Sequence, residues 1–387
     1  MIIRSKWILD SNGTLLENAV LDIENGRVIQ VRKAKCYEKS YDLGDGVVTL
    51  GLINCHNHLW LSHVNYDPSS YNNFLDWTKF IIRYVDEYEK DRVLSALETG
   101  IAQSKAFGTY CILDIQPLWM LELCCEFKLD IKLVRYVEIL GKGLDEIDKA
   151  LILNHTDGIC FHGPHTVASD TMRKILLGFP NKNPPITIHI AESEYEIEFL
   201  RTGKGPWKEL LIERGFDISR FAPFGRSPCE RLLDLGILGP ETILVHCLHL
   251  TQKEIQILKQ KGSFICICPR SNLNLHKRLP PLDELLRYGI NLCLGTDSLA
   301  SVIDLSLWED MKCLLEHFPQ IEPKSIFQMA TEGGAQAVGL GHYSIEGAVI
   351  KSLIYVESEL DVKDPYGSLI YSFDPKGMKW IGELNGL

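Results

Sequence analysis

The chain has 387 residues, 45% of them hydrophobic, and carries a formal net charge of −11. This length and apolar content suffice for one large core and a smaller one, and the negative charge disfavours a nucleic-acid partner, because phosphates attract basic surfaces. Since no apolar run approaches the roughly 20 residues of a membrane span and the N-terminus lacks a signal-peptide pattern, we expect a cytoplasmic protein without a membrane partner.

The first 50 residues are typical of short strands joined by tight turns. Residues 19–23, 27–31 and 47–50 are rich in β-forming side chains, and Glu24-Asn25-Gly26 has the composition of a hairpin turn. So small a set of strands is not stable alone.

A pair of histidines follows the first strongly apolar strand. Leu52 and Ile53 are expected to be buried in this strand, and His56 and His58 come at its end. Two residues apart on an extended chain, both imidazoles project to the same side and can hold one metal ion.

Three later apolar runs also end in residues that bind metals or move protons: His189 follows 186–188, His246 follows 243–245, and Asp297 follows 291–294. Their separations match multiples of the roughly 30 residues of a strand-helix unit in a (β/α)₈ barrel. Residues 109–115, 131–139, 158–163 and 263–269 supply the remaining strands. Since the carboxyl ends of barrel strands meet at one mouth, the sequence predicts an α/β fold with these side chains gathered there.

Together these motifs resemble the amidohydrolase superfamily, in particular the metal-dependent aminohydrolases that include S-adenosylhomocysteine and 5′-methylthioadenosine deaminases, guanine deaminase and triazine hydrolases. The motifs that carry the resemblance are Asn54-Cys55-His56-Asn57-His58, Gly163-Pro164-His165, His189-Ile190-Ala191-Glu192, Val245-His246-Cys247, Pro269-Arg270-Ser271-Asn272 and Leu294-Gly295-Thr296-Asp297-Ser298.

The resemblance implies a (β/α)₈ TIM barrel over residues 52–343 and a small composite β-sandwich from residues 1–51 and 344–387. Residues 347–356 would supply the return strand. The chain lacks the Gly-x-x-Ala-Asp-Leu signature that relatives carry there, and its tail is short, so we expect a trimmed sandwich.

The resemblance also implies a ligand set for one divalent metal: His56, His58, His189 and Asp297. Zinc is the expected ion, although three imidazoles and a carboxylate also accept iron or manganese. Some relatives bridge two metals with a lysine at the end of the fourth strand, and residues 158–163 contain none.

Three residues are the expected catalysts of a deamination. Asp297 would take a proton from the attacking water, and His246 would orient that water and stabilise charge at the attacked carbon. Glu192 would protonate the ring nitrogen and then the departing amine.

Four further residues are candidates for substrate contact. His165 matches a histidine that reaches the substrate in the resembled deaminases. Trp60 and Trp77 could stack on a heteroaromatic ring, although Trp77 could instead pack a lid helix at 74–82 onto the barrel. Arg270 could meet an anionic substrate group or anchor a carboxylate of a neighbouring loop.

The expected activity is hydrolytic deamination of an aminated purine or related heterocycle, with an adenosine-like nucleoside favoured. The alternatives are hydrolysis of another C–N bond or ring substituent on the same scaffold, and a metal-binding scaffold without catalysis. The expected partner is a small heterocyclic molecule. Dimers are common in the resembled group, so a homodimer is a further expectation.

Overall fold

The larger part of the molecule is a sheet of eight parallel strands. The computed structural model describes residues 1–87, 92–121, 131–141, 156–178 and 184–384. The strands are β6 (Leu52–Asn57), β7 (Thr109–Pro117), β8 (Lys132–Ile139), β9 (Gly158–Phe161), β10 (Ile186–Ile190), β11 (Thr242–His246), β12 (Phe264–Ile267) and β13 (Asn291–Leu294). Each pairs with the next along the chain, so the predicted barrel strands are confirmed.

The first and last strands meet at their carboxyl ends. Asn57 and Asp297 form a parallel bridge. The amide of His58 donates to the carbonyl of Asp297 at 3.2 Å, and the amide of Asp297 donates to the carbonyl of His56 at 3.0 Å. This contact closes the sheet at the edge where the predicted metal ligands lie.

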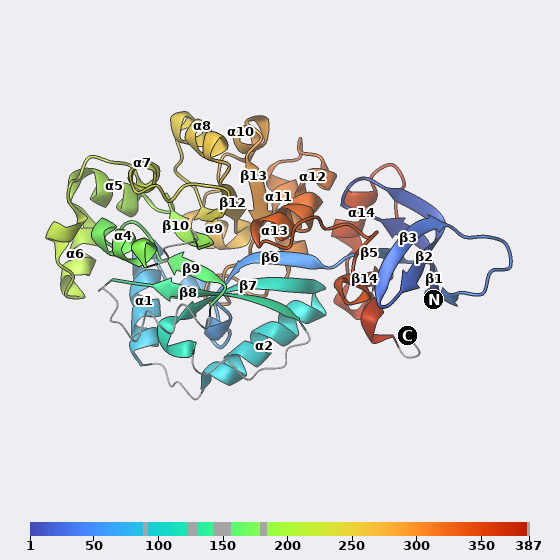
Figure 1. Cartoon of the computed structure of the whole chain (residues 1–387). Helices are drawn as coiled ribbons and strands as arrows, with labels where there is room; N and C mark the ends of the chain where they lie inside the picture. Colours follow the sequence, from blue (N-terminus) through green and yellow to red (C-terminus); the bar gives the residue numbers. More distant parts are fainter. Residues whose placement is uncertain (88–91, 122–130, 142–155, 179–183, 385–387) are drawn as a thin grey trace.

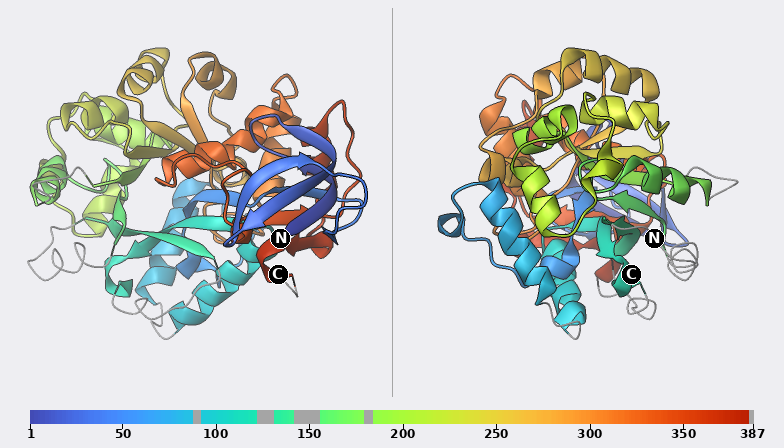
Figure 2. Two further views of the ribbon diagram at one scale, coloured as in Figure 1. Left: turned by 45° about the vertical axis from the view of Figure 1, so that its right-hand side comes forward. Right: turned by 90° about the vertical axis from the view of Figure 1, so that its left-hand side faces the viewer.

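Helices surround the sheet, as the views along two directions show (Figures 1 and 2). They are α1 (Phe74–Asp86), α2 (Val93–Ala106), α4 (Ser169–Leu177), α5 (Glu194–Thr202), α6 (Pro206–Glu213), α7 (Pro228–Asp234), α8 (Gln252–Lys261), α9 (Pro269–His276), α10 (Leu282–Arg287), α11 (Leu307–His317), α12 (Pro323–Met329), α13 (Glu332–Ala337) and α14 (Pro365–Ser372). The helix predicted over 74–82 corresponds to the first part of α1.

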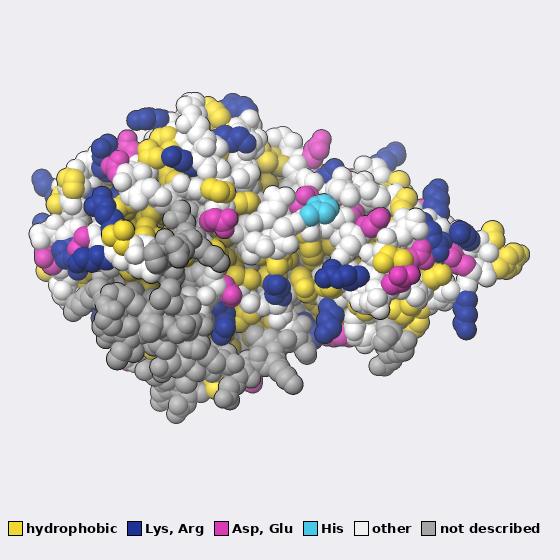
Figure 3. Space-filling view, viewed as in Figure 1, with side chains coloured by type: hydrophobic (Ala, Val, Ile, Leu, Met, Phe, Trp, Pro, Cys, Tyr) yellow, Lys and Arg dark blue, Asp and Glu magenta, His cyan; other side chains and the backbone are white. Residues whose placement is uncertain are grey.

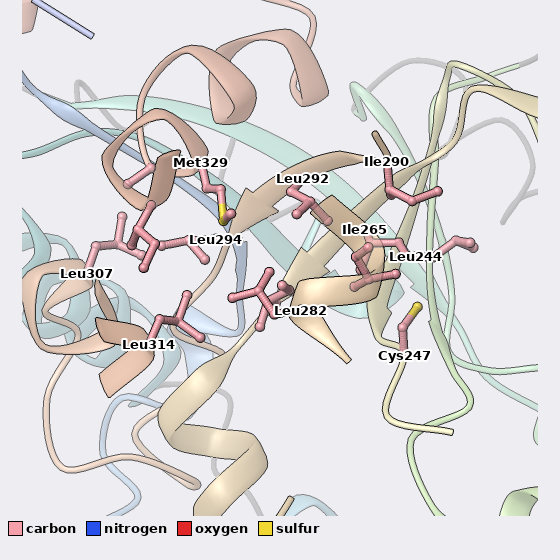
Figure 4. Close-up of a cluster of buried hydrophobic side chains, with 14 of the residues drawn as sticks. Leu244, Cys247, Ile265, Leu282, Ile290, Leu292, Leu294, Leu307, Leu314 and Met329 are labelled. Carbon is pink, nitrogen blue, oxygen red and sulfur yellow. The ribbon is translucent and has the colours of Figure 1, made fainter. Parts of the chain in front are cut away.

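Apolar side chains fill the layer between strands and helices. Figure 4 shows part of it, where side chains of β11, β12 and β13 meet those of α10, α11 and α12. The labelled members are Leu244, Cys247, Ile265, Leu282, Ile290, Leu292, Leu294, Leu307, Leu314 and Met329. Burial of this apolar surface is what holds the strand ends, and the side chains they carry, in register.

The smaller part is one mixed sheet made from both ends of the chain (Figure 1). Its strands are β1 (Ile2–Leu9), β2 (Leu15–Glu24), β3 (Arg27–Lys33), β4 (Tyr41–Asp42), β5 (Val47–Leu50), β14 (Leu353–Val356) and β15 (Met378–Trp380). The predicted hairpin joins β2 and β3, where Asn25 and Gly26 have φ values of 49° and 72°. The return strand is shorter than predicted, because residues 350–352 form a 3₁₀ turn.

The junction between the two sheets positions the histidine pair. Gly51 follows β5 and precedes β6; its amide donates to the carbonyl of Ser352 at 2.7 Å, and its carbonyl accepts from the Tyr343 hydroxyl at 2.9 Å. A Cβ on Gly51 would lie 2.9 Å from the Cβ of Tyr110. The close approach therefore requires glycine here.

No helix in the described ranges is long and apolar enough to span a bilayer. On the face shown in Figure 3, basic and acidic side chains are intermixed rather than segregated.

Candidate active site

Four side chains predicted as metal ligands converge at the mouth of the barrel. His56 and His58 come from the end of β6, His189 from β10, and Asp297 from just after β13. The Nε2 atoms of His56 and His189 lie 3.2 Å apart, and Oδ1 of Asp297 lies 3.6 Å from Nε2 of His56 and 3.9 Å from Nε2 of His58. Tetrahedral zinc with bonds of about 2.1 Å separates its ligand atoms by about 3.4 Å, so these separations suit one ion.

The charge states of these groups also suit a metal. Burial lowers the pKa of His56 and His189, and it lowers the pKa of His58 to about 3 with help from the neighbouring His56. Burial alone would raise the pKa of Asp297, but its hydrogen bond with His56 and its electrostatic interactions with the surrounding histidines outweigh burial and hold this pKa well below its usual range. At neutral pH the site therefore offers neutral imidazoles and a carboxylate, the forms that bind divalent metals.

Neighbouring groups orient two of the ligands. Oδ2 of Asp297 accepts hydrogen bonds from the hydroxyls of Ser271, at 2.6 Å, and Ser301, at 2.9 Å, which leaves Oδ1 for the imidazoles. Nδ1 of His189 lies 2.7 Å from the carbonyl oxygen of His162. Because that oxygen only accepts, His189 carries its proton on Nδ1 and presents the lone pair of Nε2 to the cluster. The donor set thus fits a divalent metal.

Four residues in or next to the site have a strained, left-handed backbone conformation. Ala191, His246, Cys247 and Asp297 have φ values of 50°, 72°, 55° and 65°, a conformation that costs residues other than glycine about 1–2 kcal/mol. Leu244 packs outward with the helices, and strict alternation would send His246 to the same side. The positive φ takes His246 out of that alternation, and its ring lies 5.5 Å from the ring of His189.

Glu192 lies beside the cluster between two histidines. Its Oε1 is 3.6 Å from Nε2 of His246 and 3.1 Å from Nε2 of His276. Burial opposes ionisation, but the charge of His246 and the hydrogen bond of His276 lower the pKa of Glu192 to about 2. Nδ1 of His246 in turn lies 2.7 Å from the amide oxygen of Asn272.

His165 faces the same cavity from the other side. It is 2% exposed, its ring lies 5.0 Å from the ring of Trp207, and its Nδ1 is 3.8 Å from Oε1 of Glu196. Within the described residues, Nδ1 has no hydrogen-bond partner. His165 also lines the cavity at the mouth of the barrel, so its ring can contact a polar ligand atom there.

The cavity at the mouth has a volume of about 530 Å³, within the range of small-molecule sites. The predicted residues Trp60 and Trp77 line it, together with His58, His189, Asp297, Glu192 and His246. The indole of Trp77 also donates to the carbonyl of Ala300 at 2.8 Å and packs on Phe74 with ring centroids 5.5 Å apart. Trp77 therefore both fixes α1 on the barrel and forms part of the cavity wall.

Arg270 is placed differently from the prediction that it contacts substrate. Its guanidinium lies 2.7 Å from Oδ1 of Asp304 and 2.9 Å from Oδ2 of Asp310, and it also donates to the carbonyls of Asp304 and Ser306 at 3.0 Å. Arg270 is not among the described residues that line the cavity. These contacts agree with the other expectation for Arg270, that it anchors a carboxylate of a neighbouring loop.

Sequence reasoning did not assign a site role to three residues that the structure brings to this region. His276 contacts Glu192 but belongs to no recognisable motif. Trp207 contacts His165, and it ends a segment, 202–207, that is consistent with a loop at the mouth in the resembled enzymes. Glu138 lines the cavity, and burial together with the charge of Asp297 raises its pKa to about 7. From the sequence, Glu138 could either face the mouth or pair with Arg135, and its position near the carboxyl end of β8 is the signal for the first of these.

Comparison with known proteins agrees with this geometry. A family model described as the amidohydrolase family matches residues 47–344. The chain is 27% identical over 375 residues to a 5-methylthioadenosine/S-adenosylhomocysteine deaminase of Saccharophagus degradans, covering 88% of this chain and 79% of that one. It is 25% identical over 309 residues to an aminodeoxyfutalosine deaminase of Deinococcus radiodurans, covering 74% and 72%.

Among solved structures, that of Helicobacter pylori aminofutalosine deaminase in complex with methylthio-coformycin superposes with a TM-score of 0.81 at 18% identity, covering 96% of each chain. The fold is therefore shared with that protein. Because the family model spans most of the chain, including every strand of the barrel and all four clustered ligands, this protein belongs to the amidohydrolase family.

Proposed function

We propose that this protein is a metal-dependent hydrolytic deaminase of an adenosine-like nucleoside. The observation that carries the proposal is the position of Glu192: it lies beside the His and Asp cluster and lines a cavity of about 530 Å³ with aromatic walls. The deaminase relatives support the same chemistry and the same class of substrate.

In this proposal His56, His58, His189 and Asp297 hold one divalent ion, zinc by preference. Such an ion, when bound, lowers the pKa of water towards about 7. Among these four ligands only Asp297 would bring a negative charge to the ion, because the three imidazoles are neutral.

The remaining chemistry is proton transfer by residues of the chain. Asp297 accepts a proton from the attacking water, while Ser271 and Ser301 hold its other oxygen. Glu192 is ionised at neutral pH, so the two protons that it delivers, first to the ring nitrogen and then to the departing amine, are the two that the attacking water loses, one of them by way of Asp297. His246 stabilises charge at the attacked carbon. The products are ammonia and an oxo-heterocycle.

The cavity walls supply substrate recognition. His165 presents a buried ring nitrogen to the ring of the nucleoside. Trp60 and Trp77 provide apolar area for the base and its substituents.

The test is ammonia release by metal-replete protein from adenosine, 5′-methylthioadenosine, S-adenosylhomocysteine, guanine and cytosine. We expect release from an adenosine derivative, lost on chelation and lowered by orders of magnitude in Glu192→Gln, whose metal content stays unchanged. Two results would contradict the deaminase assignment: conversion of a substrate without release of ammonia, or no conversion of any of these compounds by metal-loaded protein.

We also infer a cytoplasmic location and a homodimer. The described cysteines are all free thiols, which is typical of a reducing compartment. Cell fractionation and sedimentation at micromolar concentration test these two points.

A further inference from the structure

Glu192 has a second histidine partner that the proposed chemistry does not use. Nε2 of His276 lies 3.1 Å from Oε1 of Glu192, the oxygen that also faces His246. Because a carboxylate only accepts, His276 donates its Nε2–H. The side chains of His276 and Glu192 are 7% and 12% exposed, so water competes little for this hydrogen bond.

The end of a helix and an aromatic contact hold the imidazole of His276 in place. It is the last residue of α9, and Lys277 after it takes a left-handed φ of 53° that ends the helix. Its ring packs on that of Phe74, the first residue of α1, with centroids 4.4 Å apart and planes at 46°. Phe74 lines both the cavity of about 530 Å³ at the mouth and a neighbouring cavity of about 670 Å³, whereas His276 lines the second of these. His276 therefore connects the carboxylate of Glu192, through the ring of Phe74, to α1.

The backbone of Glu192 is fixed by other groups. The amides of Ala191 and Glu192 donate to the carboxylate of Glu196 at 3.0 and 2.9 Å. These bonds leave the side-chain torsions of Glu192 free, and a glutamate has several staggered conformations. The bond from His276 selects the one that keeps Oε1 beside His246 and leaves Oε2 available for proton transfer.

We propose that His276 is a positioning residue for Glu192: it donates a hydrogen bond to Oε1, and Phe74 of α1 keeps its ring in the orientation that makes this bond. The kinetic consequence of this inference rests on the proposed deaminase function. A misplaced carboxylate impairs the chemical step more than substrate binding, because Glu192 transfers protons during the chemical step.

Steady-state kinetics of three variants test the consequence. We expect His276→Ala to lower kcat about 10–100-fold with KM within about twofold and metal content unchanged. His276→Gln keeps an N–H donor and should recover part of the loss. Arg278→Ala, at an exposed neighbour, should keep the wild-type kcat. An unchanged kcat in His276→Ala, a loss of metal with it, or no recovery in His276→Gln overturns the proposal.

Nuclear magnetic resonance of ¹⁵N-imidazole-labelled protein gives a readout that does not depend on turnover. The signal of His276, identified by its absence in His276→Gln, should show a proton on Nε2 and should shift in Glu192→Gln. If wild type deaminates nothing but this shift is observed, the deaminase assignment fails and the contact stands. If the shift is absent, the positioning contact is refuted whatever the activity.

Discussion

The buried ion pair of Arg270 and Asp310 offers the sharpest test of how the mouth of the barrel is built. Asp310 is fully buried, and it accepts both from the guanidinium of Arg270 at 2.9 Å and from its backbone amide at 3.1 Å. Asp304, the other carboxylate partner, is 25% exposed at its side chain. Removing one partner of a buried pair leaves an uncompensated charge and costs about 3–5 kcal/mol.

We therefore expect Asp310→Ala to lower the free energy of unfolding by about 3–5 kcal/mol in urea titrations. Asp310→Asn keeps an acceptor for the backbone amide and should cost less. Asp304→Ala, the matched control at a more exposed site, should cost about 1 kcal/mol.

The same pair distinguishes a structural Arg270 from one that binds substrate. Arg270→Lys keeps the charge but loses the forked geometry that serves several acceptors at once. It should therefore lower stability while leaving KM within about twofold. A tenfold rise in KM at unchanged stability, or a smaller cost for Asp310→Ala than for Asp304→Ala, would refute this reasoning.

Removal of the metal by chelator should abolish ammonia release and lower the melting temperature, and zinc should restore both; activity that survives full chelation would argue against the proposed ligands. Ser271→Ala removes a 2.6 Å hydrogen bond to Asp297 and should weaken zinc retention about 10–100-fold in a chelator competition, whereas an unchanged affinity would contradict the role of this hydroxyl. Burial raises the pKa of Glu138 from 4.5 to about 7 in the folded chain, so its protonation stabilises the fold fully below pH 4.5 and this contribution is lost as the pH rises through 7. In metal-free protein, Glu138→Gln should therefore become more stable relative to wild type between pH 5 and pH 8, by at most about 1.4 kcal/mol per pH unit; a difference independent of pH would show that Glu138 titrates normally.

Much of the fold and the ligand cluster could be predicted because both depend on local patterns. An apolar strand that ends in a polar residue places that residue at the mouth of a parallel barrel, whichever helix follows. The separations of His58, His189 and Asp297 therefore sufficed to assign their strands. The hairpin at Asn25 and Gly26 was equally readable, since only a few residue types adopt positive φ at both turn positions.

What only the tertiary structure decided is which partner each polar side chain at the mouth uses. Arg270 and Asp310 are 40 residues apart, and Glu192 and His276 are 84 apart. No periodicity links such pairs, because their contact depends on how separate segments of the chain return to the same edge of the barrel. His246 shows the same limit within a strand. Alternation alone would turn it towards the helices, and a positive φ, maintained by the packing around it, turns it to the site instead. The sequence by itself thus indicated that the strand-end residues His56, His58, His189 and Asp297 reach the mouth of the barrel, and the packing of distant segments decided what the side chains around them contact there.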